Sequence, residues 1–100
     1  MVFAWFDSKE VVAFGNGLAE FLIQRIPLPD AKQGRERSEK KQKELLPKVF
    51  LQVDSFRASH RLNLYKKAKL GNAFKWKLLD AGYPSEFVDE FTKELMLRLR

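Results

Sequence analysis

Apolar and polar side chains alternate with a helical period along almost the whole chain. In the first quarter, apolar residues recur at spacings of three and four, which is typical of a helix with one face turned towards a core. Asp7 can cap this helix together with Glu10, three residues further on. We therefore predict a helix over residues 7–25, with a core stripe formed by Val11, Phe14, Leu18, Phe21 and Leu22.

Two glycines interrupt this first helix. Each of them costs up to about 1 kcal/mol relative to alanine inside a helix, so a second role is expected for them. Gly15 and Ala19 lie one turn apart, and together they predict a close crossing with another helix. Pro27 and Pro29 then end the segment.

The next stretch is polar and carries no apolar side chain larger than Ala31 between residues 30 and 44. We expect an exposed basic loop over residues 27–37, leading into a second helix over residues 38–61. The core stripe of that helix is formed by Leu45, Val49, Val53 and Phe56. Pro47 leaves two alternatives, because it either kinks a helix that starts near Ser38 or occupies the first turn of a shorter one. The kinked helix is favoured.

Asn63 is a suitable cap for a third helix over residues 63–81, and Gly82 offers a left-handed residue that ends it. Its interior leaves two alternatives open, since Gly71 either stays within the helix or divides it. The side expected to be buried consists of Leu64, Ala68 and Leu79, with Tyr65 and Trp76 alongside.

A fourth helix is predicted over residues 85–99. Its core stripe is formed by Phe87, Val88, Phe91, Leu95 and Leu99, opposite an acidic face. With short links and no alternating strand pattern, these segments predict an all-α fold, a compact bundle of about four helices in a single domain over residues 1–100.

The apolar start of the chain lacks a basic segment and meets Asp7 too early for a signal peptide. No apolar run approaches the roughly 18 residues that a transmembrane helix needs. We expect a soluble, cytoplasmic protein without a transmembrane segment. The chain has no cysteine, which excludes disulfides, thiolate metal sites and thiol nucleophiles.

Charge is concentrated in the centre of the chain. Residues 31–79 carry fourteen basic side chains against four acidic ones, while the flanking segments are slightly acidic. Between Asp54 and Asp80 there is no acidic residue at all, although seven Lys and Arg side chains lie there. Such a segment predicts a surface that attracts an acidic partner.

The candidate site for that partner consists of Arg57, Arg61, Lys66, Lys69 and Lys77, on the second and third helices. The three lysines share one face of the third helix. Phe74 and Trp76 are candidates for stacking on an unpaired base. The competing interpretation is a solvated basic face opposite core aromatics, because tryptophan at helical spacing usually belongs to a core.

The function predicted from these features is a small interaction module that binds a protein partner or a second copy of itself. The protein-partner hypothesis also draws on apolar residues outside the core stripes, namely Trp5, Phe6, Leu70, Met96 and Leu97. The alternative is a nucleic-acid-binding protein without sequence preference. A helix-turn-helix reader of DNA is excluded, since Glu86, Asp89 and Glu90 on the fourth helix would repel phosphates.

No motif in the chain predicts catalysis, and we expect it not to be an enzyme. Ser55, Ser59, Asp54 and His60 are near one another in sequence, but a nucleophile, base and orienting group must also converge in space. His60 is the only histidine, so no metal site is expected. The sequence likewise predicts no cofactor and no small-molecule ligand.

Overall fold

All four predicted helices are present in the computed structural model, which describes residues 9–26 and 32–100. Over this described part of the chain there is no strand, so the predicted all-α bundle is confirmed. The helices are α1 (Lys9–Ile23), α2 (Lys32–Ser59), α3 (Leu64–Asp80) and α4 (Ser85–Leu99).

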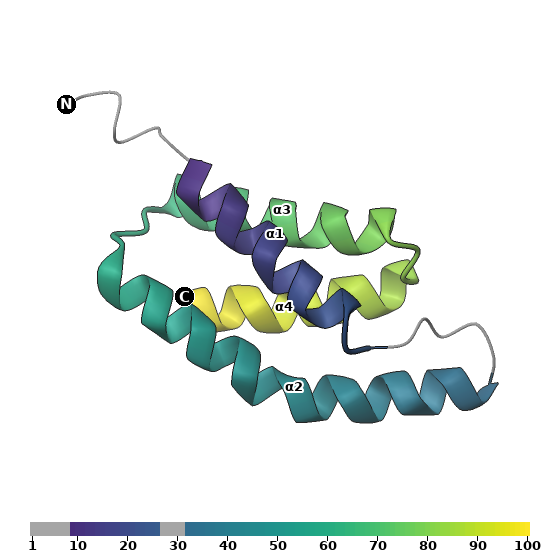
Figure 1. Cartoon of the computed structure of the whole chain (residues 1–100). Helices are drawn as coiled ribbons and strands as arrows, with labels where there is room; N and C mark the ends of the chain where they lie inside the picture. The colour runs from purple at the N-terminus through teal and green to yellow at the C-terminus, as the bar shows by residue number, and fades with distance from the viewer. Residues whose placement is uncertain (1–8, 27–31) are drawn as a thin grey trace.

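The four helices pack around one core, each against its neighbours in the order α1, α3, α4 and α2. Helix α1 crosses over α3, α3 lies along α4, and α2 packs against the opposite side of α4 (Figure 1). All four helices contribute buried apolar side chains, and the predicted core stripes of α1, α2 and α4 are confirmed. The three largest contributions of α4 are Phe91, Leu95 and Leu99.

The crossing of α1 and α3 is as close as Gly15 predicts. A Cβ atom placed on Gly15 would lie 2.6 Å from the carbonyl oxygen of Leu70 and 3.1 Å from the Cβ of Ala73. Only a residue without a side chain allows the two backbones to approach in this way. The predicted cap at Asp7 lies outside the described residues.

Helix α2 begins at Lys32, earlier than the predicted start near residue 38, and continues through Pro47. The expected loop over residues 27–37 is therefore wrong from Lys32 onwards, and residues 27–31 lie outside the described part. Lysine, glutamine, glutamate and arginine are good helix formers, so this polar stretch can extend the helix that packs on the core from Leu45 onwards. Pro47 lies close to the middle of α2, where the ribbon changes direction (Figure 1). This agrees with the kinked alternative.

Both ends of α3 are formed as predicted. The backbone N–H of Lys66 donates to Oδ1 of Asn63 at 2.8 Å, which caps the first turn. At the other end Gly82 has a φ of 100°, and the N–H of Tyr83 donates to the carbonyl of Leu78 at 3.3 Å. This is a Schellman motif, which needs a left-handed residue at the position of Gly82.

Helix α3 is not divided at Gly71. That glycine is buried against α4, where an added Cβ atom would lie 2.6 Å from the sulfur of Met96. Gly71 therefore allows close packing of two helices within an uninterrupted α3.

The buried side predicted for α3 is wrong except at Leu79, which is partly buried and packs against the core. Leu64, Tyr65 and Trp76 are 83%, 41% and 58% exposed, and Ala68 is exposed as well. The side that packs instead consists of Leu70, Gly71, Phe74 and Leu78. Both sets have helical spacing, and the second is selected because α1 meets α3 at Gly15 while α4 meets it at Gly71.

Two polar contacts connect distant parts of the chain. The hydroxyl of Tyr83, in the α3–α4 link, donates to the carbonyl oxygen of Ile26, just beyond α1. Arg98 of α4 forms a two-point ion pair with Asp54 of α2, with its Nε 3.0 Å from Oδ1. Among the helices over the described residues, none is both long and apolar enough to cross a membrane.

Candidate functional site

A shallow, open groove of about 380 Å³ runs between α1 and α3. It contains two of the predicted basic residues, Lys69 and Lys77, together with Trp76. Its full lining is Val12, Asn16, Lys69, Asn72, Ala73, Trp76, Lys77 and Asp80.

Residues at helical spacing on α1 and α3 form the walls of the groove. The lining residues of α3 run from Lys69 to Asp80. Each is adjacent to the next or lies three positions before it, so all of them occupy one face of the helix. Val12 and Asn16 lie one turn apart on α1. Because both walls are helices held together at Gly15, the positions of these side chains are set by the crossing itself.

The two lysines of the groove have different neighbours. The Nζ atom of Lys77 lies 3.1 Å from Oε1 of Glu20 on α1. Nζ of Lys69 lies 5.6 Å from the centre of the Tyr65 ring, a cation–π distance. An exposed ion pair contributes only about 0–1 kcal/mol, so Lys77 can leave Glu20 for another anion at little cost. Asp80 also lines the groove and offsets part of its positive charge.

Trp76 is the exposed aromatic side chain of this groove. The residue is 58% exposed, and Nζ of Lys75 lies 5.9 Å from the centre of its ring. Lys75 is also 3.8 Å from Oδ1 of Asp89 on α4. An exposed indole beside several ammonium groups offers a flat apolar surface next to positive charge, which is the combination expected at a stacking site.

The other predicted stacking residue is not available. Phe74 has no exposed surface, and its ring packs 5.8 Å from that of Phe91 in the core. The assignment of Phe74 to a stacking site is therefore wrong, because the ring faces α4 and not the solvent.

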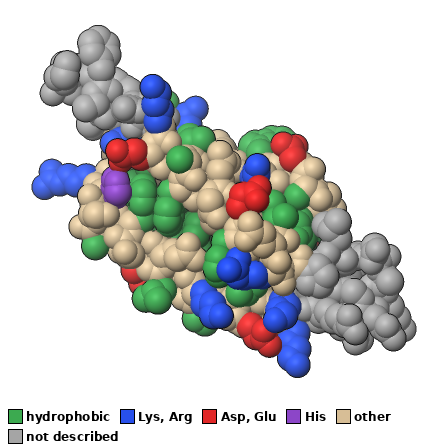
Figure 2. Space-filling view, in the orientation of Figure 1, with side chains coloured by type: hydrophobic (Ala, Val, Ile, Leu, Met, Phe, Trp, Pro, Cys, Tyr) green, Lys and Arg blue, Asp and Glu red, His purple; other side chains and the backbone are tan. Residues whose placement is uncertain are grey.

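The remaining basic residues are not gathered into the groove. Nη1 of Arg57 donates to the carbonyl oxygen of Arg98 at 2.9 Å, so Arg57 caps the end of α4. Arg61 is exposed in the α2–α3 link, and Lys66 is partly buried in the first turn of α3. On the face seen in Figure 2, Lys and Arg side chains are spread out and do not form a single patch. The structure thus places Lys69, Lys77 and Trp76 in one groove, whereas Arg57 lies at the end of α4.

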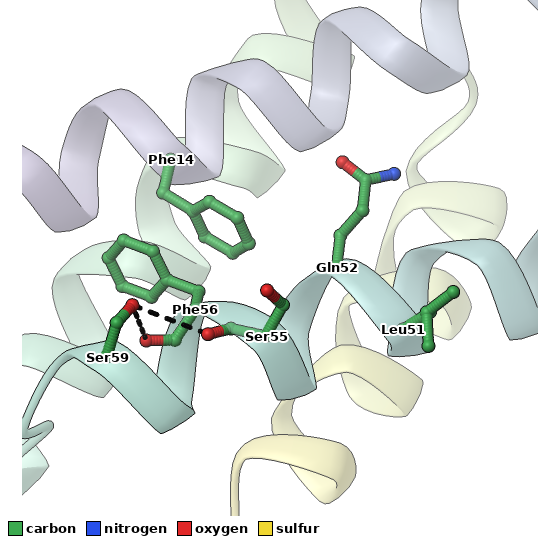
Figure 3. A pocket seen from close by; sticks show the side chains of 6 residues that line it. All are labelled: Phe14, Leu51, Gln52, Ser55, Phe56 and Ser59. Atoms are coloured by element: carbon green, nitrogen blue, oxygen red, sulfur yellow. Dashed lines mark hydrogen bonds between the residues drawn. The ribbon is translucent and has the colours of Figure 1, made fainter.

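A second open hollow, of about 420 Å³, lies between α1 and α2 (Figure 3). None of its lining side chains is charged: Phe14, Leu51, Gln52, Ser55, Phe56 and Ser59. Leu51 at its edge is 72% exposed. Figure 2 shows hydrophobic side chains on this face beside the histidine. The hollow is an apolar surface distinct from the basic groove.

Next to this hollow, three rings stack across two helices. The ring centres of Phe14 and Phe56 are 4.1 Å apart, and those of Phe56 and His60 are also 4.1 Å apart. Nε2 of His60 lies 2.9 Å from Oε2 of Glu10 on α1, and Nδ1 lies 2.9 Å from Oγ of Ser59. The contact between Glu10 and His60 was not predicted from the sequence, because the two residues lie far apart along the chain.

Ser59, His60 and Glu10 form a series of polar contacts with the residue types of a catalytic triad. The surroundings of Ser59 oppose such chemistry. Its Oγ atom lies 3.2 Å from the carbonyl oxygen of Phe56 and 3.4 Å from that of Ser55, at the C-terminal end of α2. Carbonyl oxygens at this end of a helix carry negative partial charge, which would destabilise an oxyanion.

Over the described residues, no three His, Asp, Glu or Cys side chains are grouped as a metal ion would require. No protein-family model, curated protein or solved structure matches this chain.

Proposed function

We propose that this protein is a small, non-enzymatic interaction module that binds an acidic partner through the groove between α1 and α3. The observation that carries the proposal is that Lys69, Lys77 and the exposed Trp76 line one groove. Lys66 and Arg61 extend the basic character beyond it, towards the start of α3.

The charges of this region do little for the fold, which supports a role in binding. The Lys77–Glu20 pair joins side chains that are 41% and 48% exposed, and such pairs contribute about 0–1 kcal/mol. A run of 25 residues without an acid, from Ser55 to Leu79, raises the positive potential around α3. A potential of this kind steers acidic partners and increases their association rate.

The test is a charge reversal with a matched control. The variant Lys66→Glu, Lys69→Glu, Lys77→Glu is compared with Lys40→Glu, Lys43→Glu, Lys93→Glu, which changes the net charge equally at exposed positions on α2 and α4. Binding to heparin, single-stranded DNA, duplex DNA and polyglutamate is measured at several salt concentrations. We expect the groove variant to lose binding and the control to keep it, with similar circular dichroism for both.

Charge reversal at Lys77 removes a positive charge and also adds repulsion, and a neutral substitution separates these two effects. Lys77→Glu places a carboxylate beside Glu20, so Lys77→Gln is included to remove the charge without adding repulsion. Equal polyanion binding by the groove variant and the wild type contradicts the proposal. Failure of the wild type to bind any of the four polyanions contradicts it as well.

The apolar hollow between α1 and α2 supports a second candidate function, self-association or binding of a protein partner. The specific observation is the exposed Leu51 beside a lining without charges. A concentration-dependent elution volume that disappears in Leu51→Ser supports this function, and a constant volume in the wild type excludes self-association.

A further inference from the structure

We infer that the acidic partner of the α1–α3 groove is a single-stranded nucleic acid, with one base stacked on Trp76 and phosphates bound by Lys69 and Lys77. This inference rests on the proposed function and narrows its partner to one chemical class.

The side chain of Trp76 is open to a ligand. Trp76 is 58% exposed although it belongs to a helix whose other face is fully buried. A base stacked on an aromatic side chain contributes about 1–3 kcal/mol, and every base offers a π face. In a duplex both faces of a base are already covered by its neighbours. Stacking on Trp76 therefore requires an unpaired base.

The groove carries little net positive charge. Its lining contains two lysines against Asp80, and Lys77 also lies next to Glu20. A protein that binds duplex DNA by charge alone neutralises many phosphates, commonly six to ten. This groove can neutralise about two, so stacking must supply a large share of the affinity. The expected slope of log K against log salt is about −1.4 for two phosphates on a single strand.

The groove lining also contains polar side chains other than the lysines. Asn16, Asn72 and Asp80 line the same groove and offer both hydrogen-bond donors and acceptors. Base edges carry donors and acceptors too, so an exocyclic amino group can donate to Asp80. The side chains of an acidic peptide carry only hydrogen-bond acceptors, so they offer Asp80 no donor to pair with. The lining therefore suits a nucleotide better than a run of Asp or Glu.

The experiment measures the contribution of the indole separately from that of the charges. Trp76→Ala and Trp76→Phe are compared with Leu64→Ala, which truncates an exposed apolar side chain of α3 outside the groove lining. Fluorescence anisotropy follows a labelled single-stranded DNA of mixed sequence, its duplex and a polyglutamate peptide. In a Trp5→Phe background Trp76 is the only tryptophan, so quenching of its emission reports stacking directly.

We expect Trp76→Ala to weaken binding of the single strand about 5- to 150-fold, with an unchanged salt slope. Trp76→Phe retains most of the affinity because a ring remains, and Leu64→Ala binds like the wild type. The single strand binds more tightly than the duplex and quenches the emission of Trp76.

The outcomes distinguish this inference from the proposed function. If Trp76→Ala binds the single strand as the wild type does while reversal of the groove lysines abolishes binding, the inference is overturned and the proposed function stands. Binding of polyglutamate in preference to the single strand also overturns the inference and makes the partner an acidic protein. If the wild type binds no polyanion, both are overturned.

Discussion

The backbone of α1 at Gly15 rests directly on the backbone of α3 at Leu70. A Cβ atom on Gly15 would lie 2.6 Å from the Leu70 carbonyl oxygen, a contact that side chains do not make. This contact fixes the crossing of the two helices that form the walls of the candidate groove. The same chain contains a natural comparison, because Gly17 lies on the exposed side of α1 with no atom within 4 Å of an added Cβ.

We predict opposite effects for alanine at these two positions. Gly15→Ala forces the helices apart and lowers the free energy of unfolding by about 1–3 kcal/mol, as overpacked core positions do. Gly17→Ala raises it by up to about 1 kcal/mol, because alanine is the better helix former. Urea unfolding followed by circular dichroism measures both values. A stable Gly15→Ala variant would show that the helices are not in backbone contact.

The hydroxyl of Tyr83 is expected to stabilise the fold through the chain segment after α1. It donates to the carbonyl oxygen of Ile26, and Tyr83 is almost fully buried. Tyr83→Phe leaves that carbonyl without its partner, which costs about 1–3 kcal/mol of unfolding free energy. Tyr83→Leu, which also removes the ring stacked 5.3 Å from Phe87, is expected to cost more. Equal stability of wild type and Tyr83→Phe in thermal unfolding would contradict this role.

Thr92 offers a position where the natural residue is not the most stable one. Its buried Oγ1 atom has no hydrogen-bond partner among the described residues. Thr92→Val replaces the hydroxyl by a methyl group of similar size, and we expect it to raise the unfolding free energy by about 1 kcal/mol. Thr92→Ser keeps the hydroxyl and removes the methyl group, so it should be less stable than the wild type. Urea unfolding of the three proteins tests this order.

Most of the helical architecture could be predicted because each helix carries its own local signals. Asn63 and Gly82 have side-chain and backbone properties that act within one turn, so both ends of α3 were predictable from adjacent residues. The core stripe of α4 was equally clear, since its opposite face is acidic.

The buried face of α3 could not be predicted because it depends on partners from other helices. Two apolar sets compete on α3, one containing Trp76 and the other Phe74. Trp76 is the larger side chain, yet Phe74 is buried because Gly15 and Gly71 bring α1 and α4 to its side. The two candidate stacking residues differ for the same reason. Packing of this face exposes Trp76 and buries Phe74, which therefore cannot contact a ligand.

The candidate basic residues lie in different places for a related reason. Lys69 and Lys77 share a helix face, which periodicity predicts. Arg57 is drawn to the end of α4, where the carbonyl oxygen of Arg98 accepts its hydrogen bond. Packing of α2 on α4 creates this acceptor, and no pattern within α2 indicates it.

The ion pair between Asp54 and Arg98 makes stability depend on pH in a defined direction. The hydrogen bond from Arg98 lowers the pKa of Asp54 below its ordinary value of 3.8, and the charges of Arg98 and Arg57 lower it further. A carboxyl group with a lowered pKa stabilises the fold above its unfolded pKa and loses this contribution as the pH falls through its folded pKa. The stabilisation is therefore complete at neutral pH and is lost below pH 3.8.

We predict that wild type melts at a higher temperature than Asp54→Asn at neutral pH, and that the difference closes as the pH falls below 3.8. In an Arg98→Met background the partner is absent, so Asp54→Asn should have little effect at any pH. Thermal unfolding of the four proteins from neutral to acidic pH measures both differences. A gap between wild type and Asp54→Asn that persists in strong acid, or that is unchanged in Arg98→Met, would assign the stabilisation to something other than this ion pair.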